Sequence, residues 1–169
     1  LLEMEGGGGS GEGPSVPVRV AQFGGMTLRL IRSAAVARDQ RLARLGPDIL
    51  DPEFDSQAAA SRLRASPDQV GVALLDQKLV CGIGNIFKSE ACFEARIDPW
   101  RPAASLTGAD PGSDPGAESD EAVRLLEVAR QQMLDGVETG KRPRRVYKST
   151  GRPCPRCRRT RIRARGQGD

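Results

Sequence analysis

The sequence predicts a mainly α-helical protein, and three observations support that fold class. Apolar residues make up 38% of the chain and only six residues are aromatic, so a core must be built mainly from Leu, Val, Ile and Ala. Helix signals dominate from Ser33 to Gly136, where Pro and Gly residues separate the apolar runs. The length of 169 residues suits one domain, with room for a small additional module.

The first 32 residues do not fit the helical pattern. Residues 1–17 are of low complexity and include Gly6–Gly9, which predicts a flexible segment. Residues 18–32 contain short apolar runs broken by Gly24 and Gly25, which predicts one or two strands that need a partner sheet. Because the chain begins with Leu1 rather than Met, we expect the natural start to lie elsewhere.

Residues 33–136 are expected to form the helical domain. Its predicted helices are 34–45, 56–65, about 66–77, about 85–96 and 119–134. The third has the strongest start signal, with Ser66 as N-cap, Pro67 at the first helical position and Gln69 three residues after the cap. The last helix is amphipathic and is predicted to end at Gly136.

Residues 137–169 form a basic terminal segment. Within it, residues 141–169 hold 12 Lys and Arg against one acid, whereas residues 1–140 hold 14 against 21. A segment this basic repels itself unless a polyanion neutralises it, and each phosphate contact with nucleic acid releases condensed counterions. A solvated tail is the alternative, but aromatic, Gly and Cys residues interleaved with the charge favour a nucleic-acid partner.

A glycine-rich turn, Gly82-Ile83-Gly84-Asn85, joins the two central predicted helices. A helix N-terminus exposes unpaired N–H groups and a positive dipole end, so a turn of this kind is a ready phosphate site. Asn85 could direct its side-chain amide to that phosphate and still sit near the cap position. These four residues alone fit an ordinary glycine turn with an Asn cap better.

The longer pattern resembles the helix–two-turns–helix segment of the formamidopyrimidine-DNA glycosylase and endonuclease VIII family. The matching positions are Leu74, Leu75, Asp76, Gln77, Gly82, Gly84, Asn85, Glu90, Phe93, Ala95, Ile97, Pro99 and Arg101. Leu45–Asp48 resembles the entry to that domain, and Val146–Cys157 resembles the start of the family's C-terminal zinc finger. The motifs follow the family's order between about Val18 and Gly168. The residues at Leu74–Gln77 and Lys88–Glu90 favour the endonuclease VIII-like branch.

This resemblance implies damaged-DNA binding in base-excision repair by an enzyme that removes oxidised bases and cleaves abasic sites. Such enzymes extrude the damaged base, because its glycosidic bond cannot be reached within the stack. Asn85 would contact a backbone phosphate beside the damaged nucleotide, and Gly84, Lys88, Lys148 and Arg152 are the other expected DNA-binding residues. The expected partner is duplex DNA with a damaged base or abasic site, bound by a monomer in a bacterial cytoplasm at the nucleoid.

The family's nucleophile is an N-terminal proline amine, which is followed by a glutamate. Neither Met4 nor Met26 precedes a Pro-Glu pair in this chain. We therefore expect no catalytic residue here, and we expect residues 18–32 to be the remnant of a missing β-sandwich catalytic domain. The chain is accordingly expected to be an inactive fragment of the enzyme.

Cys154 and Cys157 form a CxxC pair that is expected to bind metal. Structural zinc needs four ligands, usually two such pairs, and the family's second pair would lie past Asp169, so the zinc finger is expected to be truncated. Cys81 and Cys92 have apolar neighbours and read as small buried side chains. The sequence shows no signal peptide or membrane-length apolar run, which favours a reducing cytoplasm and argues against a disulfide.

Two alternatives to the repair enzyme stay open. The first is a non-catalytic nucleic-acid-binding protein that uses the same helical arrangement, and the basic CxxC tail after the last helix argues for the glycosylase instead. The second is a redox or metal-handling module built on Cys154 and Cys157, which ranks last because a thioredoxin-like motif needs a βαβ setting.

Overall fold

A computed structural model of the chain describes residues 2–4, 18–20, 38–107 and 120–166. The chain divides into two units, Leu1–Asp39 and Gln40–Asp169. In the first unit, strand β1 (Leu2–Met4) pairs antiparallel with β2 (Val18–Val20). Strand β1 therefore lies within residues 1–17, which were predicted to be flexible. Strand β2 begins at Val18, where a strand was predicted. The remaining predicted strand residues lie outside the described part.

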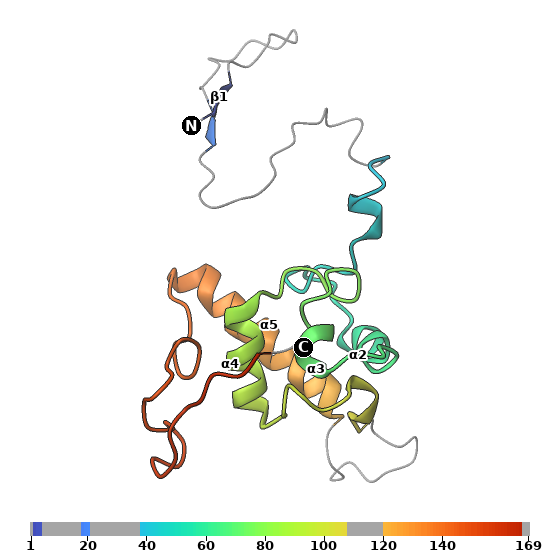
Figure 1. Cartoon of the computed structure of the whole chain (residues 1–169). Helices are drawn as coiled ribbons and strands as arrows, with labels where there is room; N and C mark the ends of the chain where they lie inside the picture. Colours follow the sequence, from blue (N-terminus) through green and yellow to red (C-terminus); the bar gives the residue numbers. More distant parts are fainter. Residues whose placement is uncertain (1, 5–17, 21–37, 108–119, 167–169) are drawn as a thin grey trace, which may run out of the picture. The chain divides into compact units, whose positions relative to one another are not determined.

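All the regular elements in the described residues of the second unit are helices, which confirms the mainly α fold class (Figure 1). Its elements are η1 (Leu42–Arg44), α2 (Ser56–Arg64), α3 (Val70–Ala73), α4 (Asn85–Ala95), η2 (Ala103–Ser105) and α5 (Glu121–Thr139). The predicted helices at 56–65 and 85–96 are confirmed as α2 and α4. No helix in the described residues is long and apolar enough to cross a membrane.

Helix α5 is the centre of the core, because both α2 and α4 pack against it. Its buried residues are Ala122, Leu125, Leu126, Ala129 and Met133, which recur at the spacing of one helix face. Leu63 from α2, Ala91 from α4 and Leu74 after α3 are fully buried against the same core. Each fully buried leucine stabilises the fold by roughly 1.5–3 kcal/mol.

The helix predicted over residues 66–77 is wrong in extent, because α3 is a single turn. Ser66 does not cap it. Its Oγ instead accepts from the N–H of Asp68 at 3.2 Å, which is a local turn. The first N–H groups of α3 donate outside the helix, from Val70 to Arg101 and from Gly71 to Pro99, both at 2.9 Å. These long-range acceptors replace the predicted cap.

Helix α5 does not end at Gly136, as was predicted, but continues to Thr139. Gly140, with φ of 67°, supplies the left-handed C-cap. Gly136 serves close packing instead, since a Cβ there would lie 3.2 Å from the carbonyl oxygen of Lys141 and 3.5 Å from the ring of Phe87. In the helix predicted over 34–45, the described part holds only the short 3-10 helix η1.

Asp120 joins two helices of the core. Its Oδ1 accepts from the N–H groups of Ala122 at 2.9 Å and Val123 at 3.0 Å, which caps α5. The same carboxylate pairs at 2.7 Å with the guanidinium of Arg64 on α2. Partial burial acts to raise the pKa of Asp120, but the N–H donors of α5 and Arg64 outweigh it and hold the pKa below its ordinary value.

We expect Asp120→Ala to destabilise the fold by about 1–2 kcal/mol, because it removes both the helix cap and the ion pair. Urea denaturation measures this loss. The folded pKa of Asp120 is depressed, so its contribution is present above the unfolded pKa of about 3.9 and is lost as pH falls through the folded pKa. Asp120→Asn keeps a cap acceptor and should lose less stability; equal losses would show that the cap contributes nothing.

Candidate functional site

The glycine turn before α4 is held by one side chain. The Nε2 of Gln77 donates to the carbonyl oxygens of Leu75 at 3.0 Å and Ile83 at 3.1 Å. Its Oε1 accepts from the N–H of Gly82 at 2.8 Å. Gln77 therefore fixes the turn on both sides, and through it the position at which α4 begins.

The two glycines of the turn serve different purposes. Gly82 has φ of 106°, and a Cβ there would lie 3.3 Å from Cγ2 of Ile49, so the fold itself requires glycine. Gly84 is extended, with φ of −112°, and apart from its own chain neighbours no atom of the described residues lies within 4 Å of where its Cβ would be. Gly84 thus meets no internal need and leaves open space at the start of α4.

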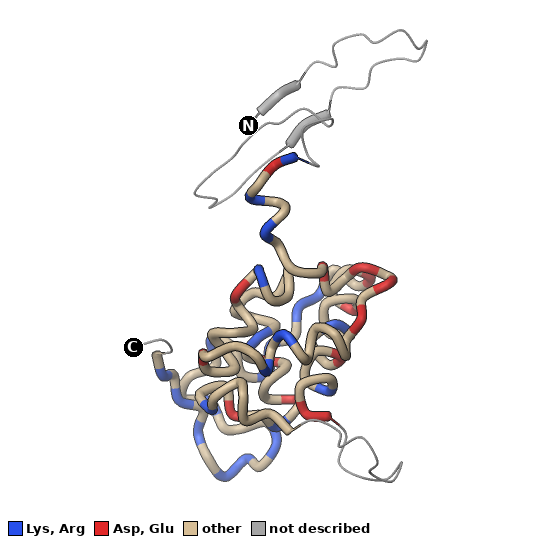
Figure 2. The backbone as a smooth tube through the Cα atoms, turned by 90° about the vertical axis from the view of Figure 1, so that its right-hand side faces the viewer, with Lys and Arg blue, Asp and Glu red and all other residues tan. Residues whose placement is uncertain are grey.

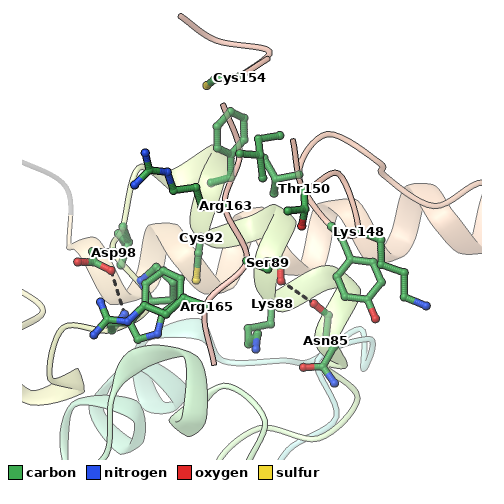
Figure 3. Close-up of a pocket in the computed structure, with 18 of the residues that line it drawn as sticks. Asn85, Lys88, Ser89, Cys92, Asp98, Lys148, Thr150, Cys154, Arg163 and Arg165 are labelled. Atoms are coloured by element: carbon green, nitrogen blue, oxygen red, sulfur yellow. Dashed lines mark hydrogen bonds between the residues drawn. The ribbon is translucent and has the colours of Figure 1, made fainter. Parts of the chain in front are cut away.

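Asn85 is the first residue of α4, and the N-cap is Gly84. The interpretation of Asn85 as an ordinary cap is therefore wrong. Its carbonyl oxygen accepts from the Oγ of Ser89 at 2.9 Å, while its exposed side-chain amide forms no hydrogen bond within the described residues (Figure 3). The amide and the open helix N-terminus are both available to a ligand.

Glu90 attaches the basic segment to α4. Its side chain is 1% exposed, and its carboxylate accepts from three consecutive N–H groups: Arg145 at 3.0 Å, Val146 at 2.9 Å and Tyr147 at 2.8 Å. The side chain of Arg145 in turn pairs with Glu94. A buried carboxylate thus meets backbone donors from a segment 55–57 residues away.

Further contacts hold the end of the basic segment near α4 and the loop after it. The Nη2 of Arg156 donates to the carbonyl oxygen of Phe93 at 2.9 Å, and its guanidinium lies 4.5 Å from the centroid of that ring. Arg165 lies 5.4 Å from the ring of Trp100, whose Nε1 donates to the carbonyl oxygen of Gly166 at 2.9 Å. Both stacked pairs are cation–π contacts.

A cleft of about 1080 Å³ lies between α4 and this segment. Three predicted DNA-binding residues line it: Asn85 and Lys88 from α4, and Lys148 from the facing segment (Figure 3). Partial burial lowers the pKa of Lys88. Lys and Arg recur along the described chain from Lys141 towards the C-terminus (Figure 2).

The remaining predicted residues are placed differently. Arg152 lines a second hollow and not the cleft, whereas Gly84 lines neither and directly precedes Asn85 as the N-cap of α4. No role was predicted for Gln77 or Glu90, although both lie among the positions that match the family's helix–two-turns–helix segment. The available signal for Glu90 was an acid directly next to the apolar Ala91 and Cys92 in the sequence.

Cys154 and Cys157 lie on a tight knuckle. The N–H of Cys154 donates to the carbonyl oxygen of Thr160 at 2.7 Å, and the N–H of Arg158 donates to that of Cys154 at 2.8 Å. Pro153 then bridges antiparallel to Arg161, so no helix follows the pair as a thioredoxin-like motif requires. The described residues contain no group of three or more His, Cys, Asp and Glu that could hold a metal, so they do not fit the four-ligand zinc site.

The cysteines differ sharply in environment. The hydroxyl of Thr160, 3.3 Å from Sγ, is the main cause that lowers the pKa of the exposed Cys157 to about 6, and the N–H groups of Thr160 and Arg159 add to it. Burial raises the pKa of Cys92 to about 12. Cys92 is therefore a small buried side chain, as predicted, while Cys81 is half-buried.

Comparison with known proteins defines the class of this helical unit. Residues 45–145 match the sequence profile of the formamidopyrimidine-DNA glycosylase H2TH domain, the helix–two-turns–helix. A probable endonuclease 8 2 from Streptomyces coelicolor is 38% identical over 149 residues, with 86% of this chain and 52% of that protein covered. A formamidopyrimidine-DNA glycosylase from Moorella thermoacetica is 39% identical over 152 residues, with coverage of 86% and 55%.

The crystal structure of the MutM (Fpg) protein from Thermus thermophilus superposes with a TM-score of 0.60 and 32% identity, over 75% of this chain and 51% of that one. The chain thus spans about half the length of the relatives it matches. It belongs to the formamidopyrimidine-DNA glycosylase and endonuclease VIII family. Relatives of both names match at nearly equal identity, so identity alone does not separate the two branches.

We expect Glu90→Ala to release the basic segment from α4, because three backbone N–H groups lose a charged acceptor worth about 1.5–3 kcal/mol per bond. Hydrogen exchange should accelerate at residues 145–147 while Leu125 and Leu126 in α5 stay protected. Glu90→Gln keeps one acceptor oxygen and should fall between the two. Unchanged exchange at residues 145–147 in Glu90→Ala would contradict the anchoring role.

We expect Cys157 to be alkylated by iodoacetamide at neutral pH in the presence of a chelator, whereas Cys92 stays unmodified until the chain unfolds. The thiolate is the nucleophile, and Cys157 combines exposure with a low pKa. Peptide mass mapping identifies the modified residue. Thr160→Val removes the hydroxyl and should slow the reaction below pH 7; the same rate in that variant would refute the hydrogen bond as the cause.

Proposed function

We propose that this chain binds the sugar–phosphate backbone of damaged duplex DNA, with one phosphate at the N-terminus of α4. The observation that carries the proposal is the open space at Gly84 beside the side-chain amide of Asn85, which forms no hydrogen bond within the described residues. A helix N-terminus directs its free N–H groups and dipole at an anion, and glycine allows the close approach. No internal packing or backbone strain accounts for glycine at this position.

The surrounding charge suits the same ligand. Lys88 stands one turn along α4 from the helix start, and Lys148 lines the same cleft from the basic segment. Burial lowers the pKa of Lys88 because it disfavours the charged ammonium. A bound phosphate would stabilise that charged form. Phosphate contacts of this kind position a protein on DNA and do not read sequence.

The names of the relatives supply the biological setting. Because they are named formamidopyrimidine-DNA glycosylase and probable endonuclease 8, we propose that binding of damaged DNA by this chain belongs to the base-excision repair of oxidised bases. Its proposed setting is the bacterial cytoplasm, where it would act as a monomer at the nucleoid. We assign no nucleophile in the described residues, and the proposal for this chain concerns binding.

The test is a matched pair of glycine variants. Gly84→Ala should fold normally, because its backbone is ordinary and its Cβ would meet nothing, yet it should weaken DNA binding about tenfold (about 1.4 kcal/mol) by filling the phosphate position. Gly82→Ala should instead destabilise the fold, because its φ is 106°. Fluorescence anisotropy with a labelled duplex that carries a stable abasic-site analogue measures affinity, and thermal denaturation measures stability.

Asn85→Ala tests the same site from the side chain. We expect weaker binding with little loss of stability, because the amide makes no contact within the described residues. Intact duplex of the same sequence is the reference for damage preference. Unchanged affinity in both Gly84→Ala and Asn85→Ala would overturn the proposed function.

A further inference from the structure

A second hollow, of about 340 Å³, lies between the start of α4 and the linker that leaves α5. Ile86, the neighbour of Asn85, forms one side of it. The linker residues Arg142, Pro143 and Arg144 form another side. The rest of its lining is Tyr147, Lys148, Ser149 and Arg152.

The charge of this hollow is of one sign. Four of its eight lining residues are cationic, and none is Asp or Glu. Arg142, Arg144 and Arg152 are exposed, and none of them forms an ion pair within the described residues. Like charges brought together in this way repel one another, so an anion between them would relieve a cost that the fold carries.

Three other arginines of the basic segment are used differently. Arg145 pairs with Glu94, Arg156 binds the carbonyl oxygen of Phe93, and Arg161 donates to that of Gly151 at 2.7 Å. These side chains hold the segment together and to α4. The fold therefore separates the arginines that build the segment from those that it presents around the hollow.

Hydrogen bonds hold the backbone of residues 145–152, which forms one side of the hollow. Glu90 binds the N–H groups of residues 145–147 immediately after the linker. The N–H of Ser149 then donates to the carbonyl oxygen of Val146 at 3.1 Å, and that of Arg152 donates to Ser149 at 3.1 Å. A preformed set of cations binds an anion at a smaller entropic cost than a flexible tail.

The hollow and the cleft share a wall. Tyr147 and Lys148 line both, while Asn85 lines the cleft and its neighbour Ile86 lines the hollow. Two places for anions therefore stand side by side along the start of α4. A ligand with regularly spaced negative charges on one strand fits this arrangement better than an isolated anion does.

We propose that this hollow is a second phosphate subsite for the bound DNA strand, with Arg142 and Arg144 as its binding residues. The inference rests on the proposed function, since it assigns the same strand to both places. Arg142 and Arg144 contact the phosphodiester backbone only, so they contribute affinity and salt dependence without sequence preference.

The experiment compares two double variants with the same change in charge. Arg142→Ala/Arg144→Ala removes cations from the hollow, whereas Arg158→Ala/Arg159→Ala removes two exposed cations of the knuckle that line neither the hollow nor the cleft. Affinity for the abasic-analogue duplex is measured over a series of salt concentrations. Each lost phosphate contact makes the logarithmic salt slope shallower by about 0.9.

We expect the linker variant to bind about tenfold more weakly with a slope shallower by about one to two, while the knuckle variant stays close to wild type. Equal effects of both variants would overturn the subsite, because net charge alone would then explain the loss. Tighter wild-type binding to an RNA duplex of the same sequence would also overturn it. The Asn85→Ala variant in the same series shows whether the α4 site binds, so the subsite can fail while the proposed function stands.

A second measurement uses inorganic pyrophosphate followed by amide chemical shifts. Shifts at residues 142–152 that vanish in Arg142→Ala/Arg144→Ala support an anion site there, and their absence in wild type overturns it. If wild type shows these shifts but binds no duplex, the proposed function fails together with the assignment of the hollow to a DNA strand, and only an anion site is left.

Discussion

The basic segment depends on one buried carboxylate. Glu90 places a negative charge inside the helical unit, and burying an isolated carboxylate costs several kcal/mol. Three consecutive backbone N–H groups offset that cost, and they come from the segment that most needs an attachment. Residues 141–169 carry 12 cations and one acid, so repulsion would otherwise favour an extended tail. The cation–π contacts of Arg156 and Arg165 add to this anchor at the far end.

Helix α4 consequently carries two functions on one rigid element. Its N-terminus stays open because Gly84 has no side chain, and Gln77 with Gly82 fixes where the helix starts. Its middle holds the basic segment through Glu90, and its buried face packs on α5. Side chains on helices and strands are positioned more precisely than side chains on loops. Here α4 forms one wall of the cleft and, through Glu90, positions the basic segment that forms the other.

Local signals in the sequence were sufficient to predict an element where residues close by in the sequence determine its structure. The glycine turn, the start of α4 and the whole of α2 follow from nearby residues, such as Asp55, whose carboxylate caps α2. Signals failed where a distant partner intervened. The start of α3 is set by carbonyl oxygens of Pro99 and Arg101, which no local cap pattern reveals.

The candidate site shows the same division. Asn85 could be selected from the turn and the family resemblance, but its role as first helical residue rather than cap depends on Gly84. Glu90 stands in the quoted motif without a sequence signal for its partners, which lie 55–57 residues further on. From the sequence, Arg142 and Arg144 could be recognised only as members of a basic segment, because the sequence does not show which cations form internal ion pairs or hydrogen bonds. The structure distinguishes the two groups, because Glu94 pairs with Arg145 and a carbonyl oxygen of α4 accepts from Arg156.

The number of residues between Asn85 and Glu90 sets the distance and the angle between the phosphate-facing end of α4 and the anchor of the basic segment. Five residues of α-helix separate them by about 7.5 Å along the axis, and each residue turns the helix by about 100°. A single inserted residue would therefore swing the anchor for the basic segment to another face of α4 while the phosphate-facing end stayed in place. The number of residues in this stretch is therefore constrained, so alignments of related chains should show no gaps between these two positions.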